Sequence, residues 1–113
     1  MKKSTTKPAS IPAPSGLSPA AVRWWRKLHG EYDLTDQAGL FLLETALRAF
    51  DRMNQAGELV DKHGPAIMDR YQQLKANPAV AAERDARSAM LGAFRALNID
   101  VVPVQKTGRL TGR

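Results

Sequence analysis

The chain of 113 residues has no cysteine, so it can form neither disulfide bonds nor metal sites built on thiolates. It lacks the glycine-rich loop GxxxxGK[ST] that binds nucleotide phosphates, which argues against nucleotide hydrolysis. No apolar run approaches the roughly 20 residues that a membrane-spanning helix needs. The basic N-terminus is not followed by the apolar stretch of a secretory signal. We therefore expect a protein of the cytoplasm, without a membrane partner.

Side chains suited to catalysis are few and isolated. His29 and His63 lie at expected helix ends, where an imidazolium suits the helix dipole. Asp33 and Asp36 flank an expected helix start, which indicates capping rather than a pair of catalytic carboxylates. We predict no catalytic residues, no metal site and no cofactor, and hence a protein that is not an enzyme.

Positive charge is concentrated near the two ends of the chain, which has a net charge of +6. Residues 1–14 contain three lysines and no acid, and residues 99–113 contain three basic residues and one acid. The remaining 11 basic and 10 acidic residues nearly cancel. Basic arms on a near-neutral body suit contact with a polyanion; the alternative is that they only aid solubility.

The longest periodic stretch, residues 35–56, has a 3.6-residue period and predicts an amphipathic central helix. Its apolar stripe contains Leu40, Leu43, Leu47 and Phe50. Thr35 is the predicted N-cap. The helix is expected to end either at Gly57 or near Gly64.

Serine or asparagine followed by proline predicts the start of two further helices. Ser18-Pro19 begins a helix that runs to about His29, and Asn77-Pro78 begins one over residues 79–98. Residues 66–74 between them fit either a short helix or a poor hairpin. The predicted fold is mainly all-α: a three-helix domain with a long central helix and a short irregular or hairpin segment near 61–76.

The predicted organisation is a disordered basic arm (1–16), a helical DNA-binding and oligomerisation domain (17–98) and an extended basic C-terminal tail (99–113). The helices carry few large apolar side chains, so self-association is favoured over a stable monomer. Many alanines on one face of the last helix indicate close helix–helix approach. The predicted oligomer interface consists of Leu40, Leu47, Ala86, Met90 and Ala93.

Trp24 and Trp25 stand among basic residues and allow two interpretations. Either they meet nucleic acid bases, or at least one packs in the core against Leu43 and Leu47. The basic side chains predicted to contact DNA phosphates are Lys2, Lys3, Lys7, Arg23, Arg26, Lys27, Lys106 and Arg109. Arg84, Arg87 and Arg95 are diluted by nearby acids, which indicates a solvated face.

Several cap and turn signals recur in a particular order along the chain. A proline-rich arm precedes Leu17-Ser18-Pro19 and the tryptophan pair, and Leu34-Thr35-Asp36 opens the central helix. Leu74-Lys75-Ala76-Asn77-Pro78-Ala79 opens the last helix, which ends in Leu97-Asn98-Ile99 with Pro103 just beyond. This order, over roughly residues 11–110, resembles the small terminase subunits of tailed bacteriophages. One group of that family has a similar K-x-N-P segment, although glycine is usual there at the position of Asn98.

The resemblance implies a non-enzymatic protein that binds viral double-stranded DNA in the host cytoplasm. It also implies a homo-oligomeric ring of about eight to ten copies. The ring would deliver DNA to the large terminase subunit, which carries the ATPase and nuclease, for genome packaging. We assign the N-terminal arm to DNA and the C-terminal tail to docking on the large subunit. The alternatives are a small dimeric helical DNA-binding regulator, or an adaptor that binds only protein.

Overall fold

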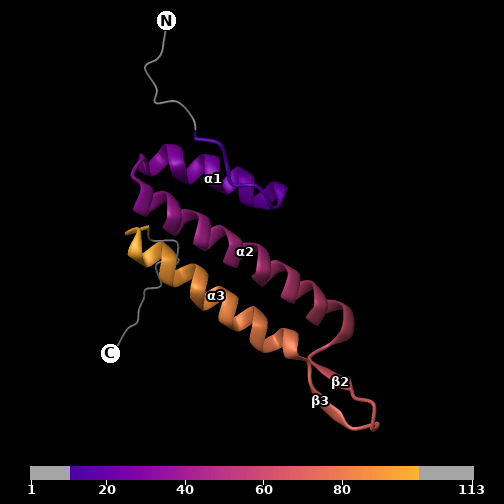
Figure 1. The fold of residues 1–113 in the computed structure, drawn as a ribbon. Coiled ribbons are helices and arrows are strands. Elements are labelled where there is room, and N and C mark those ends of the chain that lie inside the picture. The colour runs from indigo at the N-terminus through magenta and orange to yellow at the C-terminus, as the bar shows by residue number, and fades with distance from the viewer. Residues whose placement is uncertain (1–10, 100–113) are drawn as a thin grey trace, which may run out of the picture.

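The computed structural model describes residues 11–99, which form three helices and one two-stranded hairpin. Their order is α1 (Pro19–Tyr32), α2 (Gln37–His63), β2 (Ala66–Met68), β3 (Leu74–Ala76) and α3 (Pro78–Ala96). α2 lies between the other two helices, and α3 runs back along it in the opposite direction (Figure 1). The predicted mainly helical fold with a long central helix is confirmed.

Local capping chemistry fixes both ends of α1. The Ser18 hydroxyl accepts a hydrogen bond from the N–H of Ala21, and Pro19 takes the first helical position, as predicted. The helix ends three residues later than expected, because Asp33 adopts the left-handed conformation (φ 56°) and donates its N–H to the carbonyl of His29. Asp is one of the few residues that tolerate this conformation.

α2 begins at Gln37, and its N-cap lies one residue later than predicted. Asp36, not Thr35, is the N-cap, and its carboxylate accepts a hydrogen bond from the N–H of Gly39 at 3.0 Å. The helix continues through Gly57 and ends at Gly64, whose φ of 85° is unfavourable for other residues. The later of the two predicted ends is therefore correct.

Residues 66–76 form a hairpin, which decides between the two predicted alternatives. β2 and β3 are antiparallel, with Met68 paired with Leu74 and Ile67 with Lys75. The turn is built by Asp69, whose carboxylate accepts hydrogen bonds from the N–H groups of Tyr71 and Gln73. The hairpin projects from the end of the α2–α3 pair that lies away from α1 (Figure 1).

The core lies where α1 crosses the α2–α3 pair. Leu43 and Leu47 of α2 are its largest fully buried side chains. Trp25 of α1 and Phe94 of α3 pack around them from either side. Burial of this small set stabilises the packing of α1 against the α2–α3 pair.

The chain before α1 differs from the prediction of a disordered arm over residues 1–16. Residues 11–16 lie along the core, because the indole N–H of Trp25 donates to the carbonyl of Ile11 at 2.8 Å and Arg48 donates to the carbonyl of Ser15 at 3.1 Å. Ile11 and Ala13 also pack against the apolar cluster. Residues 1–10 and nearly all of the predicted C-terminal tail (100–113) lie outside the described part of the chain.

Candidate nucleic-acid interface

Three basic side chains share the outward face of α1. Arg23, Arg26 and Lys27 are spaced i, i+3 and i+4, which places them on one side of the helix. Trp25 and Leu28 are buried on the opposite side. Because α1 packs against α2 through this opposite side, all three predicted phosphate-binding side chains are exposed to solvent.

These cations differ from other arginines in their electrostatic surroundings. Within residues 11–99, none of the three forms an ion pair. The arginines with acidic partners are instead on α2 and α3: Arg48 with Glu44 (2.7 Å), Arg84 with Asp85 (3.5 Å) and Arg87 with Glu83 (3.3 Å). The prediction that acids dilute the α3 arginines is confirmed for Arg84 and Arg87, whereas Arg95 forms no ion pair among the described residues. The α1 face therefore carries three exposed cations without an ion pair among the described residues.

The two tryptophans have different roles. Trp25 is 3% exposed and belongs to the core, which confirms that one of the pair is a core anchor. Trp24 is 45% exposed, and the Lys27 ammonium lies 5.4 Å from the centre of its ring. This arrangement holds a cation beside an accessible aromatic surface, at the edge of the basic face.

The position of α1 on α2 is fixed by Ser18 and Asp51. The backbone N–H and the hydroxyl of Ser18 both donate to the Asp51 carboxylate, while the same hydroxyl caps α1. A charged acceptor strengthens both hydrogen bonds. The basic face is therefore carried on a helix with a defined orientation, as a rigid binding surface requires.

The remaining predicted DNA contacts fall outside the described residues: Lys2, Lys3, Lys7, Lys106 and Arg109. The described chain nevertheless shows where the N-terminal arm begins. Ile11 is bound to the side chain of Trp25, so the three N-terminal lysines are attached to the chain next to α1.

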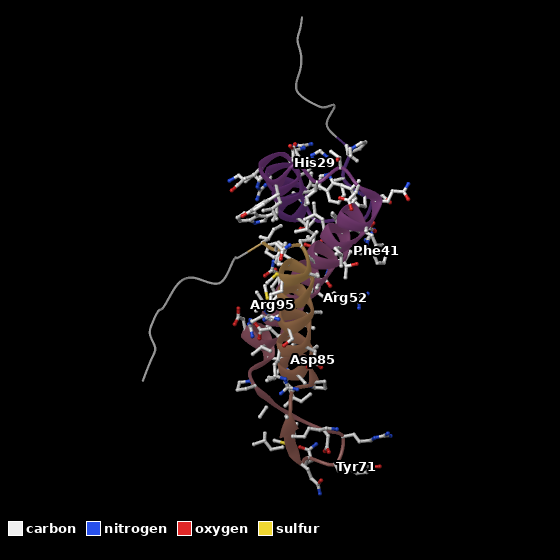
Figure 2. All side chains as sticks on the ribbon, turned by 90° about the vertical axis from the view of Figure 1, so that its left-hand side faces the viewer. His29, Phe41, Arg52, Tyr71, Asp85 and Arg95 are labelled. Carbon is white, nitrogen blue, oxygen red and sulfur yellow. The ribbon has the colours of Figure 1, made fainter. Side chains whose placement is uncertain are left out.

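A second basic element was not among the predicted sites. The hairpin carries Arg70 and Lys75, both exposed, and the Arg70 guanidinium lies 5.5 Å from the ring centre of Tyr71. Tyr71 is 72% exposed and stands at the end of the molecule opposite His29 (Figure 2). The sequence signal that could have located this turn was Asp69, which binds backbone N–H groups two and four residues ahead.

The predicted oligomer-interface residues do not all reach the surface. Leu47 and Ala93 are 1% and 8% exposed because the stripes of α2 and α3 face each other within one chain. In this fold their own chain covers them, so they offer almost no surface to a second copy. Leu40, Ala86 and Met90 are half-buried, and their part in an interface stays a prediction.

Neither histidine forms part of a ligand cluster. His29 is buried and stacked on Trp25, with ring centres 6.3 Å apart, rather than exposed at the helix end. Among residues 11–99, no three histidine or acidic side chains are grouped as metal ligands would be. Over the same residues, none of the helices combines the length and the apolar character needed to cross a membrane.

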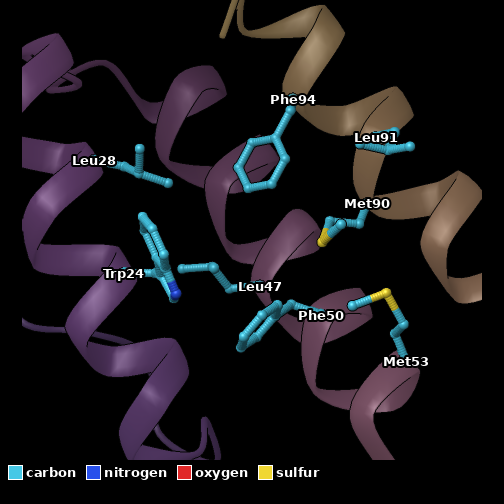
Figure 3. Close-up of a pocket in the computed structure, with 8 residues that line it drawn as sticks. All are labelled: Trp24, Leu28, Leu47, Phe50, Met53, Met90, Leu91 and Phe94. Atoms are coloured by element: carbon cyan, nitrogen blue, oxygen red, sulfur yellow. The ribbon is translucent and has the colours of Figure 1, made fainter. Parts of the chain in front are cut away.

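An apolar groove opens beside Trp24, between the three helices. Trp24 and Leu28 of α1 face Phe50 and Met53 of α2 and Met90 and Phe94 of α3 (Figure 3). Its volume is about 300 Å³. The groove lacks polar side chains among its lining residues, so it suits an apolar occupant rather than a phosphate.

Comparison with protein-family models, curated proteins and solved structures finds no match to this chain.

Proposed function

We propose that this chain is a DNA-packaging subunit of the small terminase type. In this proposal it binds viral double-stranded DNA, assembles into a ring and delivers the DNA to a large subunit that performs the ATP hydrolysis and cleavage. The chain itself is not an enzyme and acts in the host cytoplasm. The observation that carries the DNA-binding part is the exposed face of Arg23, Arg26 and Lys27 on a fixed helix, where none of the three forms an ion pair within the described residues.

Cations held this way suit the DNA backbone rather than the bases. Each phosphate contact releases condensed counterions, which supplies affinity without sequence information. The N-terminal arm, which carries Lys2, Lys3 and Lys7, precedes Ile11, and the Trp25 indole holds the Ile11 carbonyl. In a ring every copy presents the same face and arm to one duplex, so weak individual contacts combine.

The test is DNA binding measured against salt concentration. The triple variant Arg23→Gln/Arg26→Gln/Lys27→Gln should bind all duplex sequences more weakly. Each lost phosphate contact lowers the log–log salt slope by about 0.9, so up to about 2.7 is expected for each bound chain. The matched control is Arg84→Gln/Arg87→Gln/Arg95→Gln, which removes the same charge from α3 and should leave the slope nearly unchanged.

If both triple variants lose the same DNA affinity and the same salt slope, only the net charge of the chain matters. The α1 face would then not be a specific DNA-binding site. A parent protein that does not bind DNA at any salt concentration would favour the adaptor that binds only protein. Removal of residues 105–113 should weaken binding to the large subunit, and it should also lower the DNA salt slope by up to about 1.8, because it removes the two predicted phosphate contacts Lys106 and Arg109.

The dimeric regulator remains the second candidate, and native mass separates it from the ring. With a chain of 12.4 kDa, eight to ten copies give about 100–125 kDa and a dimer about 25 kDa.

A further inference from the structure

We propose that residues 101–104, Val-Val-Pro-Val, occupy the apolar groove between α1, α2 and α3 of their own chain. This inference is independent of DNA binding and of the proposed function. It assigns an intramolecular binding site to a surface that the described fold leaves open.

The groove has the properties of a site for an apolar segment. Trp24, at its edge, is 45% exposed, although the neighbouring Leu28 and Phe94 are buried. Its walls include Met53 and Met90, whose flexible thioether side chains adapt to irregular partners. Covering these surfaces removes apolar area from water, which is favourable in proportion to that area.

The described chain ends at Ile99, whose backbone is hydrogen-bonded to a residue of the groove wall. Ile99 is 3% exposed, and its N–H donates to the carbonyl of Phe94 at 2.9 Å. Phe94 in turn forms part of the groove wall (Figure 3). An extended chain covers about 3.3 Å per residue, so residues 101–104 lie within roughly 17 Å of Ile99 along the chain. The groove is therefore within reach of the segment that follows.

The composition of that segment matches the groove. Residues 101–104 are apolar, and they stand between Asp100 and Gln105 in a tail that is otherwise polar as far as Arg109. Proline and β-branched valines oppose helix formation and favour an extended segment that can lie along a groove. Because the segment is tethered, its effective concentration at the groove is in the millimolar range.

Two variants of the full chain with equal changes in charge test the proposal. Val101→Asp/Val102→Asp places charge in the proposed occupant, and Lys106→Gln/Arg109→Gln removes charge from the polar part of the tail. The first should increase acrylamide quenching of Trp24 and shift its emission to longer wavelength; the second should change neither. Trp25, which is 3% exposed, provides a constant background signal in both.

Because the chain has no cysteine, oxidative cross-linking can identify the occupant. Met53→Cys/Val102→Cys should form a disulfide within one chain. Met68→Cys/Val102→Cys is the control and should not, since Met68 lies on the hairpin at the other end of the molecule (Figure 1). If Met53→Cys/Val102→Cys forms disulfides only between chains, the occupant is the tail of a second copy and the proposal is wrong. If this variant forms no disulfide and Val101→Asp/Val102→Asp leaves the quenching of Trp24 unchanged, the segment does not occupy the groove at all.

Discussion

At the scale of single residues, neighbouring side chains of the same type have different consequences. Trp25 is enclosed by the core and also binds the carbonyl of Ile11, whereas Trp24 is held at the rim of a groove. The helix period explains this difference, because consecutive positions on a helix point about 100° apart. Only the position that coincides with Leu28 on the buried face can join the core.

Trp25→Ala should therefore cost about 3–5 kcal/mol of unfolding free energy, the range for truncating a buried aromatic side chain. It also removes the indole N–H that holds Ile11. Thermal or denaturant unfolding measures the loss, with Trp24→Ala as the control. Trp24 is 45% exposed, so its loss should cost clearly less. Equal costs for the two variants would contradict the assignment of Trp25 as the core anchor.

At the C-terminal end of α3, Asn98 takes the left-handed position that glycine usually occupies. Asn98 has φ 63° and donates its N–H to the carbonyl of Arg95, while Ile99 donates to that of Phe94. These two bonds form the Schellman arrangement that glycine normally terminates, and Asn is the common substitute. Ile99, which follows the left-handed residue, is buried in the core cluster as a result.

At the scale of elements, the predictable parts were those decided by local chemistry. Ser18-Pro19 and Asn77-Pro78 marked two helix starts because cap and proline preferences act within three residues. Thr35 and Asp36 are both good caps, so the sequence could not choose between them. The short apolar run at 66–74 fitted two periods, and only the Asp69 turn distinguished them.

Features decided by distant contacts could not be predicted. Residues 11–16 look disordered by composition, but Trp25 and Arg48 hold two of their carbonyls. The apolar stripe of α2 was visible, yet a stripe does not reveal whether its partner is the same chain or another. Leu47 was assigned to an oligomer interface for that reason, whereas α1 and α3 cover it within one chain.

The candidate basic face was predictable because the helical period alone places Arg23, Arg26 and Lys27 together.

Asn77 joins three elements and gives a prediction at this scale. Its side-chain oxygen caps α3 by accepting from Ala79, and its side-chain nitrogen donates to the carbonyl of Gly64 at the end of α2. Its backbone N–H donates to the carbonyl of Pro65, at the base of the hairpin. Asn77 is 7% exposed, so unpaired partners would remain largely away from water.

Asn77→Ala should cost about 1–3 kcal/mol, because it removes the cap and leaves the Gly64 carbonyl without this donor. Chemical denaturation would measure the change, and native-state hydrogen exchange should show weaker protection in the hairpin and first turn of α3. Asn54→Ala, on the exposed side of α2, is the control and should change stability by less than about 0.5 kcal/mol. A similar small effect at Asn77 would show that the hairpin base does not depend on this side chain.

At the scale of the whole molecule, the described fold leaves large apolar side chains uncovered away from the core. Met68, Tyr71 and Leu74 of the hairpin are 57%, 72% and 69% exposed. An isolated two-stranded hairpin is only marginally stable in water, so it gains from packing against a partner. Ala93 of α3, in contrast, is already packed in the core of its own chain. These observations favour the hairpin over the alanine stripe as the place to test self-association.

Met68→Ser/Leu74→Ser should then reduce or abolish the assembly that we propose. A closed ring needs two different surfaces on each copy, so weakening one of them prevents closure. The expected result is a fall in native mass from about 100–125 kDa towards the 12.4 kDa of the chain. The helical circular dichroism should not change, because both residues lie outside the three helices.

Two comparison variants make the outcome specific. Gln73→Ser/Lys75→Ser shortens polar side chains on the same hairpin and should assemble like the parent. Ala82→Glu/Ala89→Glu adds charge to two exposed positions of α3 that stand three or four residues from the predicted interface residue Ala86, so it tests the surface next to that residue. Loss of the ring in this α3 variant, together with full assembly of Met68→Ser/Leu74→Ser, would place the contact between copies on α3. In that case the exposed apolar side chains of the hairpin would not lie between copies. We would then expect them to contact the large subunit, which is the other protein partner in the proposed function.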